Sequence, residues 1–243
     1  MRKEGLDTTV SGNPYRFPSR DECMRCHGSN FNRALAFYPA QLNRDGQLER
    51  FFHLGMFDKE FVQMAKKQPL GNPYDESASV EQRARSWLHS NCSHCHRLSG
   101  GTSTTNQMNI SAPNDQMALI NTPPTKGRFG LENAPMIEPG NPYRSILYYR
   151  MATKGAGHMP MLGARTQDRE GVRLVHDWIR ALNPEVMTAE VSLTPKNAEE
   201  ALALYQKIQS GALLPEERKR ALAFCMKHTD PFVLNLFAGF SLE

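Results

Sequence analysis

Four of the five cysteines belong to two copies of one pattern: a cysteine, two other residues, a second cysteine and a histidine. The copies are Cys23, Cys26 and His27, and Cys92, Cys95 and His96. C-x-x-C-H is the attachment pattern of c-type haem, in which two thiols bond to the vinyl groups and the imidazole binds iron. Positions i, i+3 and i+4 of a helical turn share one face, so all three side chains can reach one porphyrin. The sequence therefore predicts two covalent haem c groups, with both histidines as iron ligands.

Two other uses of paired cysteines compete with haem attachment. Four thiolates suit a structural zinc site, and a C-x-x-C pair can carry disulfide or thioredoxin-like chemistry. Residues 27–91 separate the pairs, which is long for a zinc ribbon, and zinc needs no histidine after each second cysteine. Neither pair lies in a recognisable βαβ pattern. Cys225 has no partner cysteine in its own segment and is expected to be a small buried apolar residue.

Helix-start signals precede both motifs. Ser19 with Glu22, and Ser79 with Gln82, have the capping-box spacing. We therefore expect a short helix to begin near residue 20 and carry the first motif. A longer helix is expected to run directly into the second motif.

The rest of the chain shows helical spacing of apolar residues and no convincing strand alternation, so the predicted fold class is all-α. Further helices are expected within 46–66 with a break near Gly55, in 142–151, after Thr166, after Asn197 and from Pro215. A loop rich in Gly, Thr, Asn and Pro spans about 98–142. The apolar segment 232–240 is expected to pack onto another surface, such as residues beyond position 243.

The second motif and the segment after it resemble a class I cytochrome c, with a helix into C-x-x-C-H, a loop region, a Met-Pro loop and an amphipathic C-terminal helix. Several segments are similar to the dihaem cytochrome modules of secreted bacterial proteins, where dehydrogenase or repeat domains often accompany them. These segments are Tyr15–Ser19, Gln41–Arg44, Pro139–Tyr148, Met159 with Pro160, and Trp178. The resemblance spans residues 15 to 182, and residues 197–238 are similar to a helical spacer.

This resemblance implies two cytochrome c-like haem modules with long loops and a C-terminal helical hairpin. Residues 1–74 would form a short first haem module, and residues 75–184 a class I cytochrome c-like module. Residues 185–243 would form a haem-free helical segment. The segment Pro69–Tyr74 has the composition of a linker, which supports the first boundary.

The resemblance also implies Met159 as the sixth iron ligand of the second haem, with Met161 and Met151 as alternatives. No Met-Pro loop follows the first motif within its module. The candidates there are Met56, His53 and Met64. Each has a structural explanation as well, since methionines fill cores and a histidine can be a satisfied, partly buried polar group. An open coordination position is a further alternative.

Composition excludes several classes of partner. The 243 residues include 29 basic and 25 acidic side chains, a net charge of +4, which is far from the basic footprint of a nucleic-acid binder. No apolar run approaches the roughly 20 residues of a membrane span.

Covalent haem attachment takes place outside the cytoplasm, so a periplasmic or otherwise exported location is expected. Because residues 1–7 hold no apolar signal segment, we expect the chain to be a mature form, a fragment, or one given from a downstream start.

The leading functional hypothesis is single-electron transfer by two haems between a redox partner protein or fused dehydrogenase domain and an external acceptor. It needs no catalytic residues, and the chain has no G-x-S-x-G, H-E-x-x-H or P-loop pattern. Two alternatives stay open: a dihaem peroxidase-like enzyme with an open first haem, and a haem-bearing interaction module of a larger redox assembly. In the resembling proteins the helical spacer can precede a further haem domain, so further haem domains beyond the ends of this chain are an additional expected partner.

Overall fold

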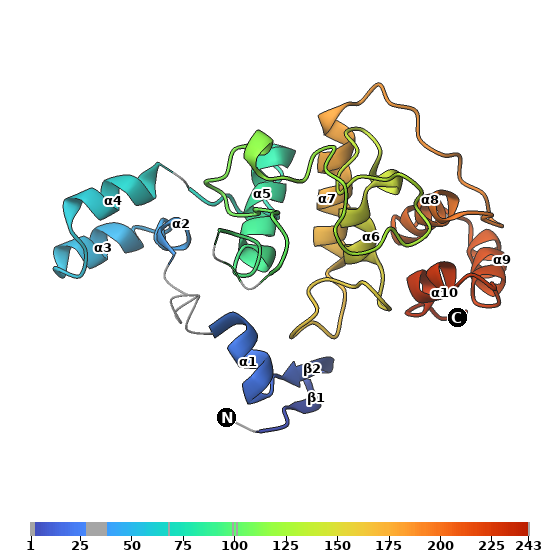
Figure 1. Cartoon of the computed structure of the whole chain (residues 1–243), viewed down its shortest axis with the longest axis horizontal. Coiled ribbons are helices and arrows are strands. Elements are labelled where there is room, and N and C mark those ends of the chain that lie inside the picture. Colours follow the sequence, from blue (N-terminus) through green and yellow to red (C-terminus); the bar gives the residue numbers. More distant parts are fainter. Residues whose placement is uncertain (1–2, 28–37, 68, 99, 101, 243) are drawn as a thin grey trace. The chain divides into compact units, whose positions relative to one another are not determined.

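The computed structural model describes residues 3–27, 38–67, 69–98, 100 and 102–242. Most of the regular structure is helical, and one two-stranded sheet accompanies the helices (Figure 1). The chain divides into two compact units. The first unit is Met1–Leu6 with Phe17–Ala118, and the second is Asp7–Arg16 with Leu119–Glu243.

The small sheet corrects the expectation of an all-α chain. Strands β1, Leu6–Val10, and β2, Asn13–Phe17, pair as a hairpin around Ser11 and Gly12, which both have positive φ. None of the side chains of its two strands is buried, and the strands lack the apolar alternation that would reveal them in a sequence. Turn chemistry, with glycine in the left-handed region, is what forms this hairpin.

Helices of the first unit begin where the capping signals predict. Helix α1, Arg20–His27, carries the first motif, and helix α5, Val80–Cys92, leads into the second. At α1 the Ser19 N–H donates to Glu22 Oε2 at 2.7 Å and the Glu22 N–H donates to Ser19 Oγ at 3.1 Å, which completes the capping box. At α5 the Gln82 N–H donates to Ser79 Oγ at 3.2 Å.

Between these two helices the first unit forms a small helical hairpin with its own core. Its helices are α2, Pro39–Leu42, α3, Gln47–His53, and α4, Lys59–Lys66. Gly55, with φ +70°, lies in the break between α3 and α4, as predicted. The core consists of apolar side chains from all three helices and the break: Leu42, Leu48 and Ala65, flanked by Phe51, Phe57 and Phe61.

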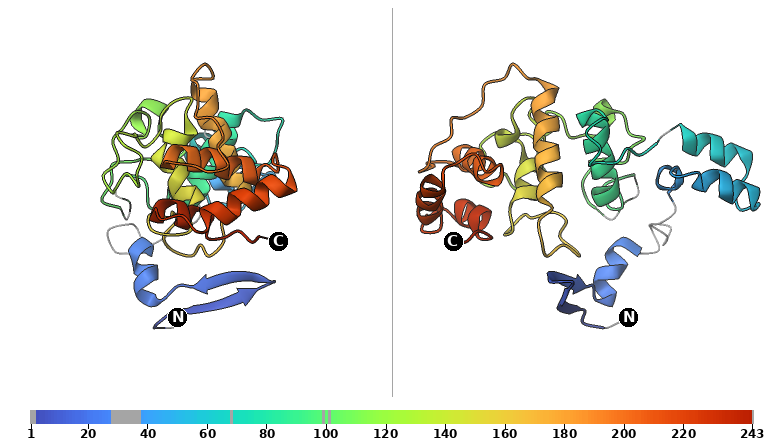
Figure 2. Two further views of the ribbon diagram at one scale, coloured as in Figure 1. Left: turned by 90° about the vertical axis from the view of Figure 1, so that its right-hand side faces the viewer. Right: turned by 180° about the vertical axis from the view of Figure 1, so that it is seen from behind.

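The second unit is built from helices around an aromatic core. Besides most of the β1–β2 hairpin, it contains these helices: η3, Pro142–Arg144, α6, Ile146–Ala152, α7, Arg169–Leu182, α8, Ala198–Gln209, α9, Pro215–Cys225, and α10, Pro231–Phe237 (Figures 1 and 2). Tyr148, Trp178, Tyr205 and Phe237 are among its fully buried side chains. Cys225 is also fully buried, as expected of a small apolar residue.

The apolar C-terminal end packs onto another surface, as expected, and that surface belongs to α6 and α8 of the same unit. Phe232 stacks on Tyr149 of α6 with ring centroids 4.3 Å apart, and Phe237 meets Tyr205 of α8 edge-on. Phe232 and Phe237 are buried, together with Val233. The apolar stripe of α10 is therefore part of the core of the second unit.

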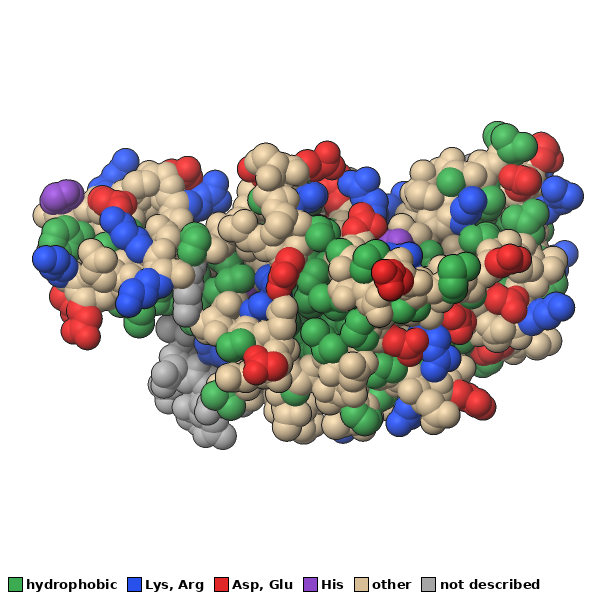
Figure 3. Space-filling model, turned by 90° about the horizontal axis from the view of Figure 1, so that it is seen from above, with side chains coloured by type: hydrophobic (Ala, Val, Ile, Leu, Met, Phe, Trp, Pro, Cys, Tyr) green, Lys and Arg blue, Asp and Glu red, His purple; other side chains and the backbone are tan. Residues whose placement is uncertain are grey.

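The two compact units divide the chain at other positions than the predicted modules, whose boundaries after residues 74 and 184 stay predictions. Among the described residues no helix has the length and apolarity to cross a bilayer. Figure 3 shows basic and acidic side chains interspersed over the visible face, as the near balance of charge predicts.

Candidate functional site

The first motif lies wholly on helix α1. Cys23, Cys26 and His27 occupy positions i, i+3 and i+4, so their side chains share one face of that helix. None of the eight side chains of α1 is buried. A helix this short gains most of its stability from packing an apolar face, and α1 has no such buried face. Cys23 and Cys26 are half-buried, whereas Met24, Arg25 and His27 of the same helix are exposed.

The second motif begins in the last residue of α5 and continues in the turn after it. Cys92 ends the helix, and its carbonyl accepts hydrogen bonds from Cys95 N–H at 3.1 Å and His96 N–H at 2.9 Å. Ala84 and Leu88, which precede Cys92 at intervals of four residues on the same face of α5, are buried and anchor that face. This arrangement keeps the three motif side chains on one tight turn.

His96 is held by the loop after the motif. Its Nδ1 lies 3.3 Å from Thr104 Oγ1, and its carbonyl accepts a hydrogen bond from the Met108 N–H at 2.8 Å. The Thr104 hydroxyl in turn lies 2.7 Å from Thr102 Oγ1. A histidine that ligates a metal through one ring nitrogen usually donates the other N–H to a protein or water oxygen. The Thr104 hydroxyl supplies such an oxygen.

The two motifs meet at their second cysteines. Cys26 Sγ lies 3.4 Å from Cys95 Sγ, and a ligand nitrogen of His94 lies within 4.8 Å of both sulfurs. All five cysteines are free thiols. Burial raises the pKa of Cys92 and of Cys95 to about 12, so both are protonated at neutral pH.

This cluster differs from a structural zinc centre. Among the described residues, Cys26, His94 and Cys95 are the cysteine, histidine or carboxylate side chains that come together as a group of three or more. Each motif contributes one sulfur, and Cys23 and Cys92 stay outside. A closed structural zinc site needs four ligands, which this group does not provide.

Met159, the predicted sixth ligand of the second haem, lies in the second unit, in the loop between α6 and α7. Its N–H donates to the Arg150 carbonyl at 2.8 Å. The Arg150 guanidinium holds the same loop, since it donates to Gly157 O at 3.1 Å and lies 4.7 Å from the centre of the Phe129 ring. His96 lies in the first unit, so ligation by Met159 stays a prediction.

The two alternatives to Met159 differ in burial. Met151 is a buried core residue of α6, whereas Met161 is 63% exposed. Met159 is half-buried.

The candidates for the first haem all lie on the α3–α4 hairpin. Met56 is 60% exposed and Met64 is 52% exposed, so neither fills the core. His53, the last residue of α3, is also exposed. Their roles stay predictions.

Sequence reasoning missed three residues of this region. His94 lies inside the second motif, where its spacing carries no separate signal. Thr104 lies in a loop with several similar hydroxyl residues, so the sequence does not single it out. Arg85 lies on α5, and nothing in the sequence distinguishes it from an exposed helical arginine. The structure shows instead that Arg85 is buried and binds the loop after the motif.

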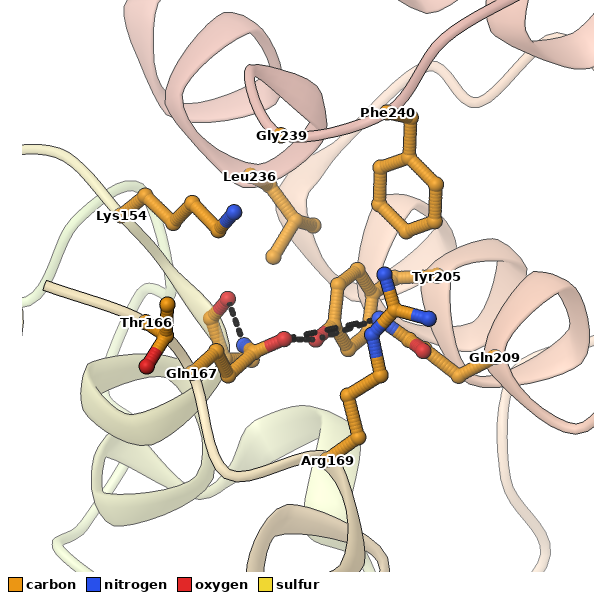
Figure 4. A pocket seen from close by; sticks show the side chains of 10 residues that line it. Lys154, Thr166, Gln167, Arg169, Tyr205, Gln209, Leu236, Gly239 and Phe240 are labelled. Carbon is orange, nitrogen blue, oxygen red and sulfur yellow. Dashed lines mark hydrogen bonds between the residues drawn. The ribbon is translucent and has the colours of Figure 1, made fainter. Parts of the chain in front are cut away.

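A pocket of about 220 Å³ lies in the second unit, between the loop before α7 and helices α8 and α10 (Figure 4). The Gln167 amide donates to the carbonyls of Met151, at 3.1 Å, and Ala152, and it accepts from the Tyr205 hydroxyl at 2.6 Å. Gln209 Nε2 donates to the same hydroxyl at 3.0 Å. The polar side chains of the pocket are therefore paired with one another or with backbone carbonyls. These hydrogen bonds connect α8 to the loop before α7, so their role is structural.

The site therefore consists of two helical turns, four reduced cysteines, two following histidines and a supporting loop. Such turns can present paired thiols and one imidazole to the same planar group. Comparisons with protein-family models, with curated proteins and with solved structures found no match.

Proposed function

We propose that the chain is a dihaem c-type cytochrome that carries single electrons between a donor protein or domain and an external acceptor. The observation that carries the proposal is that both C-x-x-C-H motifs lie on helical turns with all their cysteines reduced. Thioether attachment consumes thiols, so reduced pairs on one helical face are the state it requires.

The residues around the motifs fit such a group. Helix α1 has no buried side chain, and a porphyrin would cover the face that carries Cys23 and Cys26. His96 has its Nδ1 against Thr104 Oγ1, which would fix the plane of the ring for iron binding through Nε2. Haem iron, when bound, alternates between the ferric and ferrous states and so takes up and gives up one electron.

The chain's own residues would then set how that iron behaves. Cys23, Cys26, Cys92 and Cys95 would hold the two groups covalently, with His27 and His96 as proximal ligands. Met159 is proposed as the sixth ligand of the second haem, and a thioether there would favour ferrous iron and raise the potential. Met56 and His53 are the proposals for the first. The location would be periplasmic or otherwise exported, with a redox protein or fused dehydrogenase domain as partner.

A second candidate function is peroxide reduction at an open first haem. The exposure of both His53 and Met56 favours it, because an exposed side chain on its own hairpin is a weakly held ligand. A high-spin, five-coordinate ferric spectrum with peroxide turnover would support this enzyme. Two low-spin, six-coordinate haems would support the electron carrier.

The test is to produce the chain in cells competent for haem attachment and measure its intact mass and pyridine haemochrome spectrum. We expect two haem additions. Cys23→Ala with Cys26→Ala should lose one of them, whereas Cys225→Ala, which changes a buried thiol outside the motifs, should lose none. An unmodified mass with zinc bound would overturn the proposal.

A further inference from the structure

The two C-x-x-C-H motifs are in direct contact through one cysteine of each. Cys26 and Cys95 are the second cysteines of their motifs, and their sulfurs lie 3.4 Å apart within one compact unit. We infer that Cys26 and Cys95 form a junction that holds the two attached haem groups edge to edge as a coupled pair. This inference rests on the proposed function.

Thioether chemistry converts this sulfur contact into a contact between the groups. Each thiol adds across a vinyl double bond: a sulfur–carbon bond forms, the thiol hydrogen goes to the other vinyl carbon, and no electrons are lost. The addition thus needs no oxidant. Each sulfur becomes a substituent at the rim of its own porphyrin, so two sulfurs in contact bring the two rims together.

The surroundings of the junction strengthen the coupling. Cys26 and Cys95 are both half-buried, and the half-buried His94 imidazole lies beside both sulfurs. Protein atoms therefore replace part of the water around the contact. Because charges interact more strongly at lower dielectric, a charge added at one group is felt at the other.

Other uses of these two sulfurs fit less well. A disulfide has its sulfurs about 2.0 Å apart, whereas these are 3.4 Å apart and reduced. A metal site built on Cys26, His94 and Cys95 would leave Cys23 and Cys92 without a role. The junction uses all four cysteines, each in the same chemistry.

The test compares the intact holoprotein with two single-haem variants in Soret circular dichroism. One variant is Cys23→Ala with Cys26→Ala, and the other is Cys92→Ala with Cys95→Ala. We expect the intact protein to show two bands of opposite sign, and the sum of the two variants to lack that couplet. Intact mass first establishes the number of haems on each protein.

A second measurement needs no variant. In the fully oxidised holoprotein, the electron paramagnetic resonance signals of the two ferric haems should be broadened by each other, and reduction of one haem should sharpen the other signal.

Two attached haems with additive circular dichroism and independent resonance signals would overturn the junction and leave the proposed function standing. A chain without attached haem would overturn both.

Discussion

Replacement of Arg85 by methionine tests how the loop after the second motif is held. Arg85 is buried on α5, and its guanidinium donates to Asn114 Oδ1 at 2.7 Å, to Ile110 O at 3.2 Å and to Ala112 O. The same loop contributes the Thr104 hydroxyl to the second motif. Arg85→Met keeps much of the apolar stem and removes the donors.

The size of the effect follows from these bonds. A hydrogen bond to a charged group contributes about 1.5–3 kcal/mol to stability. The Arg85 guanidinium makes such bonds to the acceptors named above and a longer one, of 3.4 Å, to Asn109 O. Two effects offset part of this: the variant no longer desolvates a buried charge, and Arg85 Nε has no partner among the described residues. We expect a net loss of about 2–4 kcal/mol in the free energy of unfolding.

Urea denaturation followed by far-UV circular dichroism measures this loss. With a slope of about 1–3 kcal/mol per molar urea, the midpoint should fall by roughly 1–2 M. Arg50→Met is the matched control, because Arg50 is exposed on α3, and it should change stability by less than about 0.5 kcal/mol. Equal midpoints for the two variants would refute the reasoning, since the buried bonds would then contribute nothing.

Three further perturbations probe the site and the fold. Thr104→Val removes the oxygen beside His96 Nδ1 and should raise the potential of the second haem by up to about 40 mV in a redox titration, equivalent to a hydrogen bond of about 1 kcal/mol; an unchanged or lower potential would contradict this role. Burial lowers the pKa of His89 to about 4, so the unfolded chain takes up a proton first as pH falls from 6.5. Stability should decline by about 3 kcal/mol between pH 6.5 and 4, and His89→Gln should reduce that decline in denaturation curves. Gly140→Ala places a Cβ against the Asn183 carbonyl oxygen at φ +84°, and it should lower the free energy of unfolding by about 2–4 kcal/mol in a thermal unfolding experiment. The control is Gly163→Ala, at φ +77° in open space, which should lose only the free energy needed to hold alanine at positive φ. Similar losses for both variants would exclude the clash.

Local chemistry was predictable wherever a signal and its effect lie within one turn. The capping of α1 by Ser19 and Glu22 depends on residues three apart, and so does the start of α5 at Ser79. The break at Gly55 depends on that residue's own backbone freedom. The sequence also identifies the two motifs and their six side chains, because the pattern is defined by residue types at fixed spacing.

Features that join distant segments required the tertiary structure. The β1–β2 hairpin shows no apolar alternation, and the C-terminal phenylalanines look unpartnered until Tyr149 and Tyr205 are placed beside them. The burial of Arg85 is likewise invisible in a helix pattern.

The sequence by itself determined that four thiols and two imidazoles form two equivalent sets, because covalent spacing on a helical turn is a local property. Tertiary structure alone decided that Cys26 meets Cys95 and that Thr104 meets His96. The cysteine contact joins α1 to the turn after α5, and the threonine contact depends on how a loop folds back. Such contacts depend on how distant segments pack against each other, and the spacing of residues along the chain does not indicate which segments meet.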